Sequence, residues 1–386
     1  MKKVLLRGPV LTQSGYGVHC RQIARWLLSK NNIDLKFQAT PWGDTPWLVN
    51  PDYQGGLVGR IMDRTVDPTG TKFDVSVQLQ LPNEWDPNIA SYNVGVSALV
   101  ETDKCNPAWV SAANRMDRVI VPSKHAADCL TASGEVTKPL SVIPESFSDS
   151  VLVPQKTDIF DFSTSFNFLL FGQLTGNSPV NDRKNIYNTV KWFCETFAND
   201  PEVGLVIKTN SGRNTMIDQK VVTGILSSII HQCRRGAFPR IHLLHGELSD
   251  DEVAALYRHP KIKAYISLTR GEGYGLPTLE AAASGLPVIA TGWSGHMDYL
   301  NVGKFINVGY RLVDVHPSRI DGSIFVKGSK WAEPSEDDFK KRISKFRTNS
   351  DVPKQWALDL ESKLSKTHDF ESIARQYDEL LGSAFT

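Results

Sequence analysis

Apolar and polar positions along this chain fall into blocks that predict strands and helices in turn. Residues 3–8 form a short apolar run typical of a buried strand, and residues 19–29 place apolar side chains at helical spacing. The loop 11–17 between them contains two glycines. A strand, a glycine-containing loop and a helix in this order are the opening of a Rossmann-like unit.

The same alternation continues to the end of the chain. In the first half, further strands are predicted at residues 73–81, 91–99, 117–123 and 140–144. In the second half, strands are predicted at residues 166–171, 203–207, 241–244, 264–268, 287–290 and 305–308. Helices are predicted at residues 185–197, 249–257 and 361–381, the second of which opens with a capping-box sequence. Strands that alternate with helices indicate an α/β protein with parallel sheets.

Two segments lack such a pattern. Residues 41–71 are rich in Trp, Pro, Gly and Asp and are predicted to be a loop, and residues 157–165 are predicted to be part of a polar linker. A chain of 386 residues is long enough for two α/β domains.

Composition excludes several classes of protein. The apolar fraction of 41% and the charged fraction of 22% are ordinary for a soluble globular protein, and no apolar run is long enough to predict a membrane span. The N-terminal apolar run is too short for a secretory signal. Five cysteines without metal-like spacing predict reduced thiols and a cytoplasmic protein. A net charge of +1 gives no overall basic field of the kind that many nucleic-acid binders carry.

The most informative segment is residues 269–285, which read T-R-G-E-G-Y-G-L-P-T-L-E-A-A-A-S-G. It follows the predicted strand 264–268 and leads into a short helix predicted at residues 279–283. Its three glycines permit close approach of the backbone to a ligand, and Pro277 suits the first position of a helix. We expect free amides at the start of this helix to favour an anion such as a diphosphate. These amides belong to Leu276, Thr278 and Leu279.

Two carboxylates flank this predicted anion site. Glu272 precedes it and Glu280 lies just inside the helix. An ionised carboxylate only accepts hydrogen bonds, so it suits a pair of neighbouring sugar hydroxyls. A diphosphate site between two such carboxylates predicts a nucleotide-sugar site.

The spacing of seven residues between Glu272 and Glu280, with the glycines and the proline, resembles the E-x7-E signature of retaining glycosyltransferases of family 4 and their relatives. The resemblance implies the GT-B fold, in which two Rossmann-like domains with parallel sheets face each other across a cleft. It implies that Glu272 contacts the donor sugar and that Glu280 contacts the nucleotide ribose. The other donor-binding residues predicted in this segment are Gly273, Tyr274, Gly275, Leu276, Pro277 and Thr278.

The resemblance also implies a domain organisation. Residues 1–160 are expected to form an acceptor-binding domain and residues 161–360 a nucleotide-sugar-binding domain. The helix in residues 361–386 is expected to return to the first domain.

Cations are predicted to neutralise the donor diphosphate. Lys208 ends an apolar strand, and ligands bind at the carboxyl ends of parallel strands. The family places an Arg after the glycine of the loop 172–182 and a Lys at the following helix start. Here Gln173 occupies the position of that Arg, and Lys184 matches the Lys. Arg183 or Lys208 is therefore expected to supply the second charge, with solvated surface cations as the alternative.

Five further residues are candidates for contact with the donor or the acceptor. Gly15, Tyr16 and Gly17 lie in the first loop, where backbone contact with a phosphate or the acceptor competes with a plain tight turn. Glu101 is a candidate for a catalytic role near the transferred sugar, and a helix-start acid is the alternative. His296 is a candidate for contact with the sugar or phosphate, against the alternative of a structural histidine.

The resemblance implies a hexosyl- or pentosyltransferase that retains the anomeric configuration. It implies no enzymic nucleophile, because the leaving phosphate helps to deprotonate the acceptor. No D-x-D motif follows a strand, and Asp250 and Asp251 are predicted to be helix-start acids. We therefore expect no metal and no cofactor beyond the nucleotide sugar, whose base and sugar are not encoded by any residue type.

The acceptor is less constrained. Residues 78–85, 100–103 and 121–123 are similar to a subgroup of family-4-like transferases in large tailed bacteriophages. This similarity suggests the hypothesis that the acceptor is a hydroxymethylated pyrimidine in phage DNA, in the host cytoplasm, although the near-neutral charge is an argument against it. The alternatives are a surface glycan or lipid-linked saccharide as acceptor, or an inactive protein that only binds a nucleotide sugar.

Overall fold

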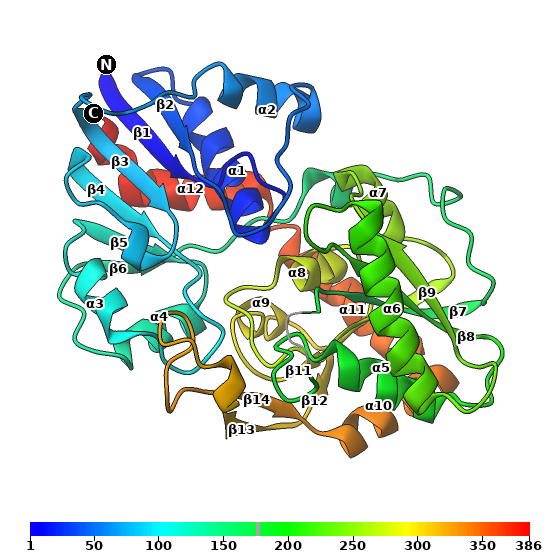
Figure 1. Cartoon of the computed structure of the whole chain (residues 1–386). Helices are drawn as coiled ribbons and strands as arrows, with labels where there is room; N and C mark the ends of the chain where they lie inside the picture. The colour runs from blue at the N-terminus through cyan, green and yellow to red at the C-terminus, as the bar shows by residue number, and fades with distance from the viewer. Residues whose placement is uncertain (175–177) are drawn as a thin grey trace. The chain divides into compact units, whose positions relative to one another are not determined.

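The computed structural model describes residues 1–174 and 178–386, which form two compact units (Figure 1). Unit 1 comprises Met1–Ser146, Gly322–Val326 and His368–Thr386. Unit 2 comprises Phe147–Asp321 and Lys327–Thr367. These units divide the chain at residues other than the predicted domain boundaries at 160 and 360.

Unit 1 is built on a parallel sheet of six strands in the order β2-β1-β3-β4-β5-β6. The strands are β1 (Lys2–Gly8), β2 (Ile33–Ala39), β3 (Phe73–Leu79), β4 (Ala90–Val96), β5 (Arg118–Val121) and β6 (Leu140–Val142). The helices are α1 (Gly15–Leu28), α2 (Tyr53–Met62), α3 (Pro107–Ala113), α4 (Lys124–Thr131) and α12 (Phe370–Leu381). Apolar side chains of α1, α2 and α12 share one core with β1 to β4.

Unit 2 is built on a second parallel sheet of six strands, in the order β12-β11-β10-β7-β8-β9. The strands are β7 (Phe166–Phe171), β8 (Val203–Thr209), β9 (Arg240–His245), β10 (Ile262–Ser267), β11 (Val288–Thr291) and β12 (Ile306–Val308). The antiparallel hairpin of β13 (Tyr310–Asp314) and β14 (Lys330–Pro334) is separate from this sheet.

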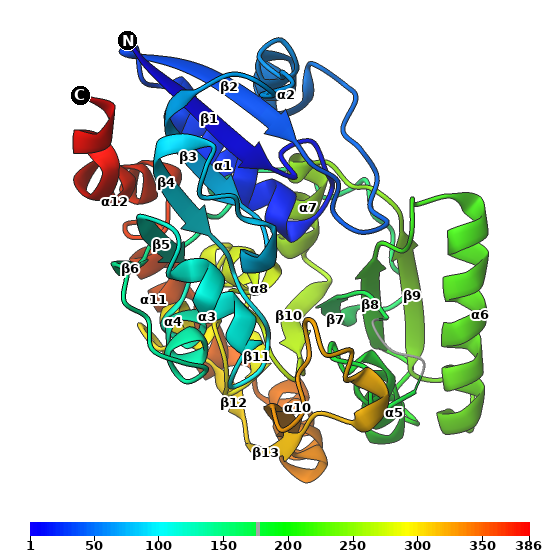
Figure 2. The same cartoon turned by 60° about the vertical axis from the view of Figure 1, so that its left-hand side comes forward.

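Helices cover both faces of the sheet in unit 2 (Figure 2). One face carries α5 (Ile186–Thr196), α6 (Met216–Cys233) and α10 (Glu336–Thr348). The other face carries α7 (Asp250–Tyr257), α8 (Leu276–Ala283) and α11 (Asp351–Leu364), and the short helix α9 (Met297–Leu300) lies next to α8. Each predicted strand of this unit is present. Strands β7, β8, β10 and β11 are largely buried apolar runs between turn residues, whereas β9 is only half-buried.

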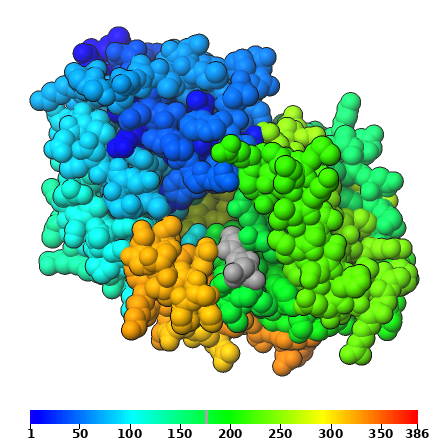
Figure 3. Space-filling model, in the orientation of Figure 1, coloured from blue at the N-terminus to red at the C-terminus, as the bar shows by residue number. Residues whose placement is uncertain are grey.

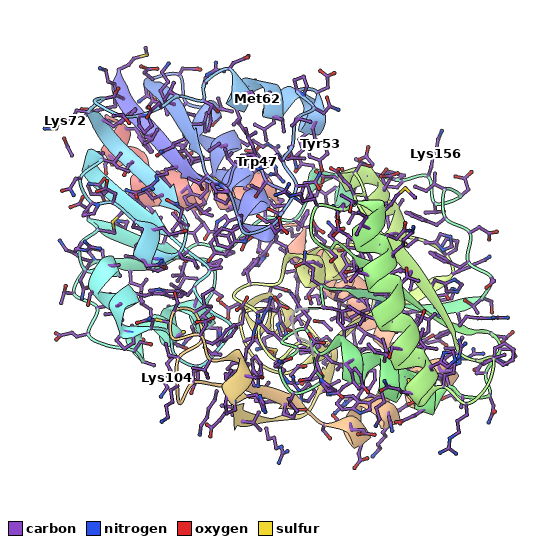
Figure 4. The ribbon with its side chains drawn as sticks, viewed as in Figure 1. Trp47, Tyr53, Met62, Lys72, Lys104 and Lys156 are labelled. Atoms are coloured by element: carbon purple, nitrogen blue, oxygen red, sulfur yellow. The ribbon has the colours of Figure 1, made fainter. Side chains whose placement is uncertain are left out.

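The predictions were wrong for three segments. Residues 41–71 contain α2; Trp47 before this helix and Met62 at its end are exposed (Figure 4). The predicted C-terminal helix is two helices, since α11 ends at Leu364 and α12 begins at Phe370. Helix α8 begins at Leu276, one residue before Pro277, the predicted first position, and three residues before the predicted run 279–283.

No helix among residues 1–174 and 178–386 has the length and apolar character needed to cross a membrane. All five cysteines are free thiols.

Candidate functional site

The strand order of unit 2 reverses between β7 and β10. The chain adds β8 and β9 on one side of β7, and β10, β11 and β12 on the other. Ligands of open α/β sheets bind outside the carboxyl ends of the strands at such a switch point. The segment that follows β10 contains Glu272, and the segment that follows β7 leads to Arg183 and Lys184, so the sheet brings these residues together.

Arg270 joins these two segments. Its guanidinium donates to the carbonyl oxygens of Pro179 (2.8 Å) and Asp182 (2.9 Å) and pairs with Glu333 of β14 (2.8 Å). Its own amide donates to the carbonyl of Arg183 (2.8 Å). Arg270 is 2% exposed, and the hairpin to which it binds lies at the surface (orange in Figure 3). The arginine therefore fixes the loop that carries Arg183 and Lys184.

The start of α5 is capped by a side chain from the same loop. Asp182 Oδ2 accepts from the amides of Ile186 (2.7 Å) and Tyr187 (3.3 Å). Asn185 adopts a left-handed backbone conformation with φ of 54°, which turns the chain into the helix. Lys184 is thereby placed at the helix start, as predicted. Of the loop 172–182, residues 175–177 lie outside the described residues.

Glu272 is a buried carboxylate between two cations. Its Oε1 lies 2.6 Å from Lys184 Nζ, and its Oε2 lies 3.5 Å from Arg183 Nη1. Burial raises the pKa of Glu272, but the charges of Lys184 and Arg183 outweigh burial and lower it to about 2. Glu272 is therefore ionised at neutral pH, which is the state required to accept sugar hydroxyls.

The turn after β11 holds the backbone of Glu272. Ser294 Oγ accepts from the Glu272 amide (2.9 Å), and the Gly295 amide donates to the Glu272 carbonyl (2.9 Å). Farther along, Tyr299 donates its hydroxyl to the Gly275 carbonyl (2.7 Å). Ser294 and Tyr299 were not predicted from the sequence, because neither residue has a local pattern that marks it as a partner of the glycine-rich loop.

The start of α8 differs from its prediction. Gly275 has φ of 93°, and its carbonyl accepts from the amides of Thr278 (2.9 Å) and Leu279 (3.2 Å). These two amides are therefore not free, and Pro277 is the second helical residue rather than the first. Among the described residues, the amides of Gly275 and Leu276 have no acceptor, so an anion site at this helix start depends on them.

Two predicted donor-binding side chains lie in the core. Tyr274 is 3% exposed, and its ring packs edge-on against Tyr299. Thr278 is 2% exposed. These side chains support the glycine-rich loop from within the core. Contact of Gly273, Tyr274 or Thr278 with a donor remains a prediction.

Glu280 has the opposite environment to Glu272. It is partly exposed, and its Oε2 accepts from the Tyr257 hydroxyl (3.2 Å). Burial and the charge of Asp250 raise its pKa to about 7. Because no cation among the described residues compensates for the desolvation of Glu280, it is only partly ionised near neutral pH.

Lys208 lies at the carboxyl end of β8, two strands from β10 and therefore roughly 10 Å across the sheet. Its Nζ donates to Asn210 Oδ1 (2.5 Å) and to the Gly246 carbonyl (2.6 Å). Burial lowers the pKa of Lys208 to about 8, against the opposing charge of Glu247. Lys208 is thus a buried cation at the same edge of the sheet as Glu272, but not in contact with it.

His296 is completely buried at the start of α9. Its Nε2 lies 2.7 Å from the Thr291 carbonyl and its Nδ1 lies 3.4 Å from Ser294 Oγ. Both ring nitrogens therefore face protein groups, and burial lowers the pKa of the imidazole. The predicted contact of His296 with sugar or phosphate remains a prediction.

The remaining candidates belong to unit 1. Gly15, Tyr16 and Gly17 form the first turn of α1 rather than a loop, and the Gly17 amide donates to Ser14 Oγ (2.9 Å). Tyr16 hydrogen-bonds with Ser97 (3.0 Å) through its hydroxyl and stacks on Trp42. Glu101 lies partly buried after β4. The roles predicted for these residues remain predictions.

Asp250 and Asp251 form the first turn of α7, whose capping box pairs Ser249 with Glu252. They are helix-start acids, as predicted. In the part of the chain that the structure describes, no three His, Cys, Asp or Glu side chains gather in a way that could hold a metal ion.

This chain is similar to known glycosyltransferases. Residues 240–316, which include Glu272, Glu280 and Ser294, match a family model described as "Glycosyl transferases group 1". A curated relative, "Probable sucrose-phosphate synthase" of Thermosipho melanesiensis, is 24% identical over 214 residues, or 55% of this chain. The match spans 45% of the relative, less than half of its length.

Solved structures match almost the whole chain. Sucrose-phosphate synthase from Thermosynechococcus elongatus has a TM-score of 0.67 at 13% identity and covers 100% of this chain and 99% of its own. Anabaena HepE, solved with UDP and glucose, has a TM-score of 0.64 at 14% identity and covers 99% of this chain and 100% of its own. The two units therefore have the GT-B fold, and the comparisons together support a glycosyltransferase.

Proposed function

We propose that this protein is a retaining glycosyltransferase that moves a sugar from a nucleotide sugar to a hydroxyl acceptor. The observation that carries the proposal is the ionised, buried Glu272 between Lys184 and Arg183 at the switch point of unit 2. HepE was solved with UDP-glucose, so we take UDP-glucose as the first donor to test.

The proposed donor lies with its diphosphate against the amides of Gly275 and Leu276 at the start of α8. Lys184, Arg183 and Lys208 neutralise its two negative charges and those that develop as the sugar leaves. With Glu272 ionised, these three cations leave a net positive site that matches a doubly charged diphosphate. This balance supports a reaction without a metal, which we propose and which an assay with a chelator tests: activity that is lost with EDTA and restored by a divalent cation contradicts it.

Glu272 is proposed to accept from hydroxyls of the transferred sugar and Glu280 from those of the ribose. Unit 1 is proposed to bind the acceptor, with Glu101 near the reacting hydroxyl. The leaving phosphate, rather than a side chain, is proposed to take the proton of the acceptor. The products are a glycoside with the anomeric configuration of the donor and a nucleoside diphosphate.

The acceptor class rests on sequence similarity alone. A hydroxymethylated pyrimidine in DNA remains our hypothesis from residues 73–130, and the net charge of +1 gives it no support. Incubation with UDP-glucose and hydroxymethylcytosine DNA, followed by digestion to nucleosides and mass spectrometry, tests it. Oligosaccharide and lipid-linked acceptors in parallel reactions test the alternative.

We expect thermal stabilisation of the wild-type protein by UDP-, GDP- or ADP-sugars to identify the donor base, since a ligand that binds the native state raises its stability.

The test of the activity itself uses Glu272→Ala. Donor hydrolysis or transfer should fall at least about 100-fold in Glu272→Ala, because the variant loses a contact to the reacting sugar. Nucleotide-sugar binding by the wild type without turnover would instead favour the inactive binding protein.

A further inference from the structure

The turn between β11 and α9 forms hydrogen bonds with both the amide and the carbonyl of Glu272. The Glu272 amide donates to Ser294 Oγ, and its carbonyl accepts from Gly295, each at 2.9 Å. A side chain at Gly295 would have its Cβ 2.1 Å from the Gly273 carbonyl oxygen. The two segments therefore approach so closely that only glycine fits at position 295 without moving one of them.

The hydrogen bonds behind Ser294 have a fixed direction. The Thr291 carbonyl can only accept, so His296 Nε2 carries a proton and donates to it across 2.7 Å. In the neutral imidazole Nδ1 then has a lone pair, which faces the Ser294 hydroxyl at 3.4 Å. The hydroxyl directs its proton to Nδ1, which leaves its oxygen to accept from the Glu272 amide. Burial lowers the pKa of His296 and supports the neutral form.

The backbone of Ser294 is strained. Its φ of 87° lies in the left-handed region that favours glycine, and the residue is 5% exposed. Glycine would adopt this conformation without a Cβ penalty but would offer no hydroxyl. Strain that persists at a site is a reason to look for a function in the group that causes it.

We propose that Ser294 and His296 are positioning residues for Glu272: Ser294 fixes its amide, and His296 orients the Ser294 hydroxyl that does so. The pair thereby orients the Glu272 carboxylate between Lys184 and Arg183, where the sugar is expected to bind. This role rests on the proposed function, and it gives His296 an action through Ser294 instead of contact with the donor.

Ser294→Gly and Ser294→Ala separate strain from hydrogen bonding. Glycine removes the strain together with the hydroxyl, so its Tm should stay near that of the wild type. Alanine keeps the strain and loses the hydroxyl, so its Tm should fall. Both variants should lower kcat for UDP-glucose turnover about tenfold or more, with a smaller change in KM, because the aim of Glu272 matters most in the transition state.

The matched control is Asn214→Gly. Asn214 also has a positive φ, of 61°, and lies in a loop after β8. Its replacement by glycine should leave kcat unchanged. If Ser294→Gly retains wild-type kcat, the positioning role is overturned.

Hydrogen exchange of the Glu272 amide gives a readout that does not depend on activity. The amide should exchange faster in Ser294→Gly than in the wild type and at the wild-type rate in Asn214→Gly. Unchanged exchange in Ser294→Gly overturns the inference even if the protein proves to be no glycosyltransferase. Faster exchange in a protein without turnover supports the contact and contradicts only the proposed function.

The contribution of His296 is tested by two amide variants. His296→Asn places an oxygen near the position of Nδ1, where it can accept from Ser294, whereas His296→Gln places its amide nearer to Nε2. We expect His296→Asn to keep more of the Glu272 amide protection and of kcat than His296→Gln. Equal losses in both variants, at equal Tm, overturn the role of His296.

Discussion

Glu272 and Glu280 show how environment assigns different states to two identical side chains eight positions apart. Burial raises the pKa of Glu272, but Lys184 and Arg183 hold it at about 2. The stability that its ionisation contributes is therefore fully present above pH 4.5 and is lost as pH falls through 2. Burial and Asp250 raise the pKa of Glu280 to about 7. The stability that protonation of Glu280 contributes is present below pH 4.5 and is lost as pH rises through 7.

The affinity for UDP-glucose should fall below pH 7 if Glu280 binds the ribose as a carboxylate. Each pH unit below its pKa reduces the ionised fraction about tenfold, which sets the upper limit of the effect. Glu280→Gln should bind more weakly at pH 8 and show little change between pH 6 and pH 8. Isothermal titration calorimetry at these two pH values measures both. A wild-type affinity that is the same at pH 6 and pH 8 contradicts the assignment.

Lys208 should affect binding and stability in opposite directions at high pH. Its pKa is lowered to about 8 by burial, so donor binding should weaken above pH 8 as its charge is lost. Because the folded state releases this proton before the unfolded state, the Lys208 contribution to the free energy of unfolding rises between pH 8 and 10.5.

The measurement compares UDP-glucose affinity and urea unfolding at pH 7.5 and 9.5 in the wild type and in Lys208→Met. Lys191, a surface residue of α5 paired with Glu195, gives the matched control Lys191→Met. Parallel pH profiles in the wild type and Lys208→Met would mean that another group titrates.

At the scale of elements, the sequence predicts those strands and helices that have a local pattern of apolar residues. The segment from β10 to α8 was predictable, because a buried apolar run is followed by glycines and a short helix. Helix α2 was missed because the glycines near its start favour a loop in the sequence. In the structure Gln54, Gly55 and Gly56 have positive φ values, so the first turn of α2 is not regular helix. The hairpin β13–β14 was missed because Tyr310 and Leu312 are exposed and leave no inward apolar pattern.

The supports of the candidate site depend on distant contacts. Arg270 contacts Glu333, 63 residues later, and Pro179, 91 residues earlier, so no local motif reveals the connection. Glu272 and Lys184 were predictable as site residues because each lies at a strand or helix end, whereas their mutual contact follows only from the strand order. Ser294 has no sequence signal beyond the neighbouring glycines.

Arg270→Lys should destabilise unit 2 and weaken donor binding. Lysine keeps the charge but cannot bond Pro179, Asp182 and Glu333 at once, because it lacks the planar guanidinium. Loss of buried hydrogen bonds of a charged group should lower the free energy of unfolding by about 2–4 kcal/mol. The measurement is urea unfolding together with UDP-glucose affinity.

The control for this variant is Arg342→Lys. Arg342 pairs with Asp338 along the surface of α10, where the exchange should cost less than about 1 kcal/mol. Equal losses in the two variants would show that Arg270 does not clamp the loop.

At the scale of the whole molecule, the polarity of a segment did not predict the boundary between the two units. Residues 157–165 look polar, yet Phe162 is 2% exposed and packs with Phe147 and Val151 in unit 2. The chain therefore joins unit 2 at Phe147. At the other end, Phe370, Tyr377 and neighbouring apolar residues of α12 complete the core of unit 1, so the C-terminal segment leaves unit 2 after Thr367.

The fragment 147–367 should fold and bind UDP-glucose. It contains both apolar cores of unit 2 and every cation and carboxylate assigned to the donor, namely Arg183, Lys184, Lys208, Glu272 and Glu280. It lacks unit 1 except residues 322–326, so it should not transfer the sugar. We expect a dissociation constant within about tenfold of the full chain, a difference of about 1.4 kcal/mol, by calorimetry.

A cooperative thermal transition and a helical circular-dichroism spectrum establish whether the fragment folds. The fragment carrying Glu272→Gln is the control, and its binding should be weaker than that of the unaltered fragment because it loses the acceptor for sugar hydroxyls. A folded fragment that leaves UDP-glucose unbound would contradict a donor site complete in unit 2.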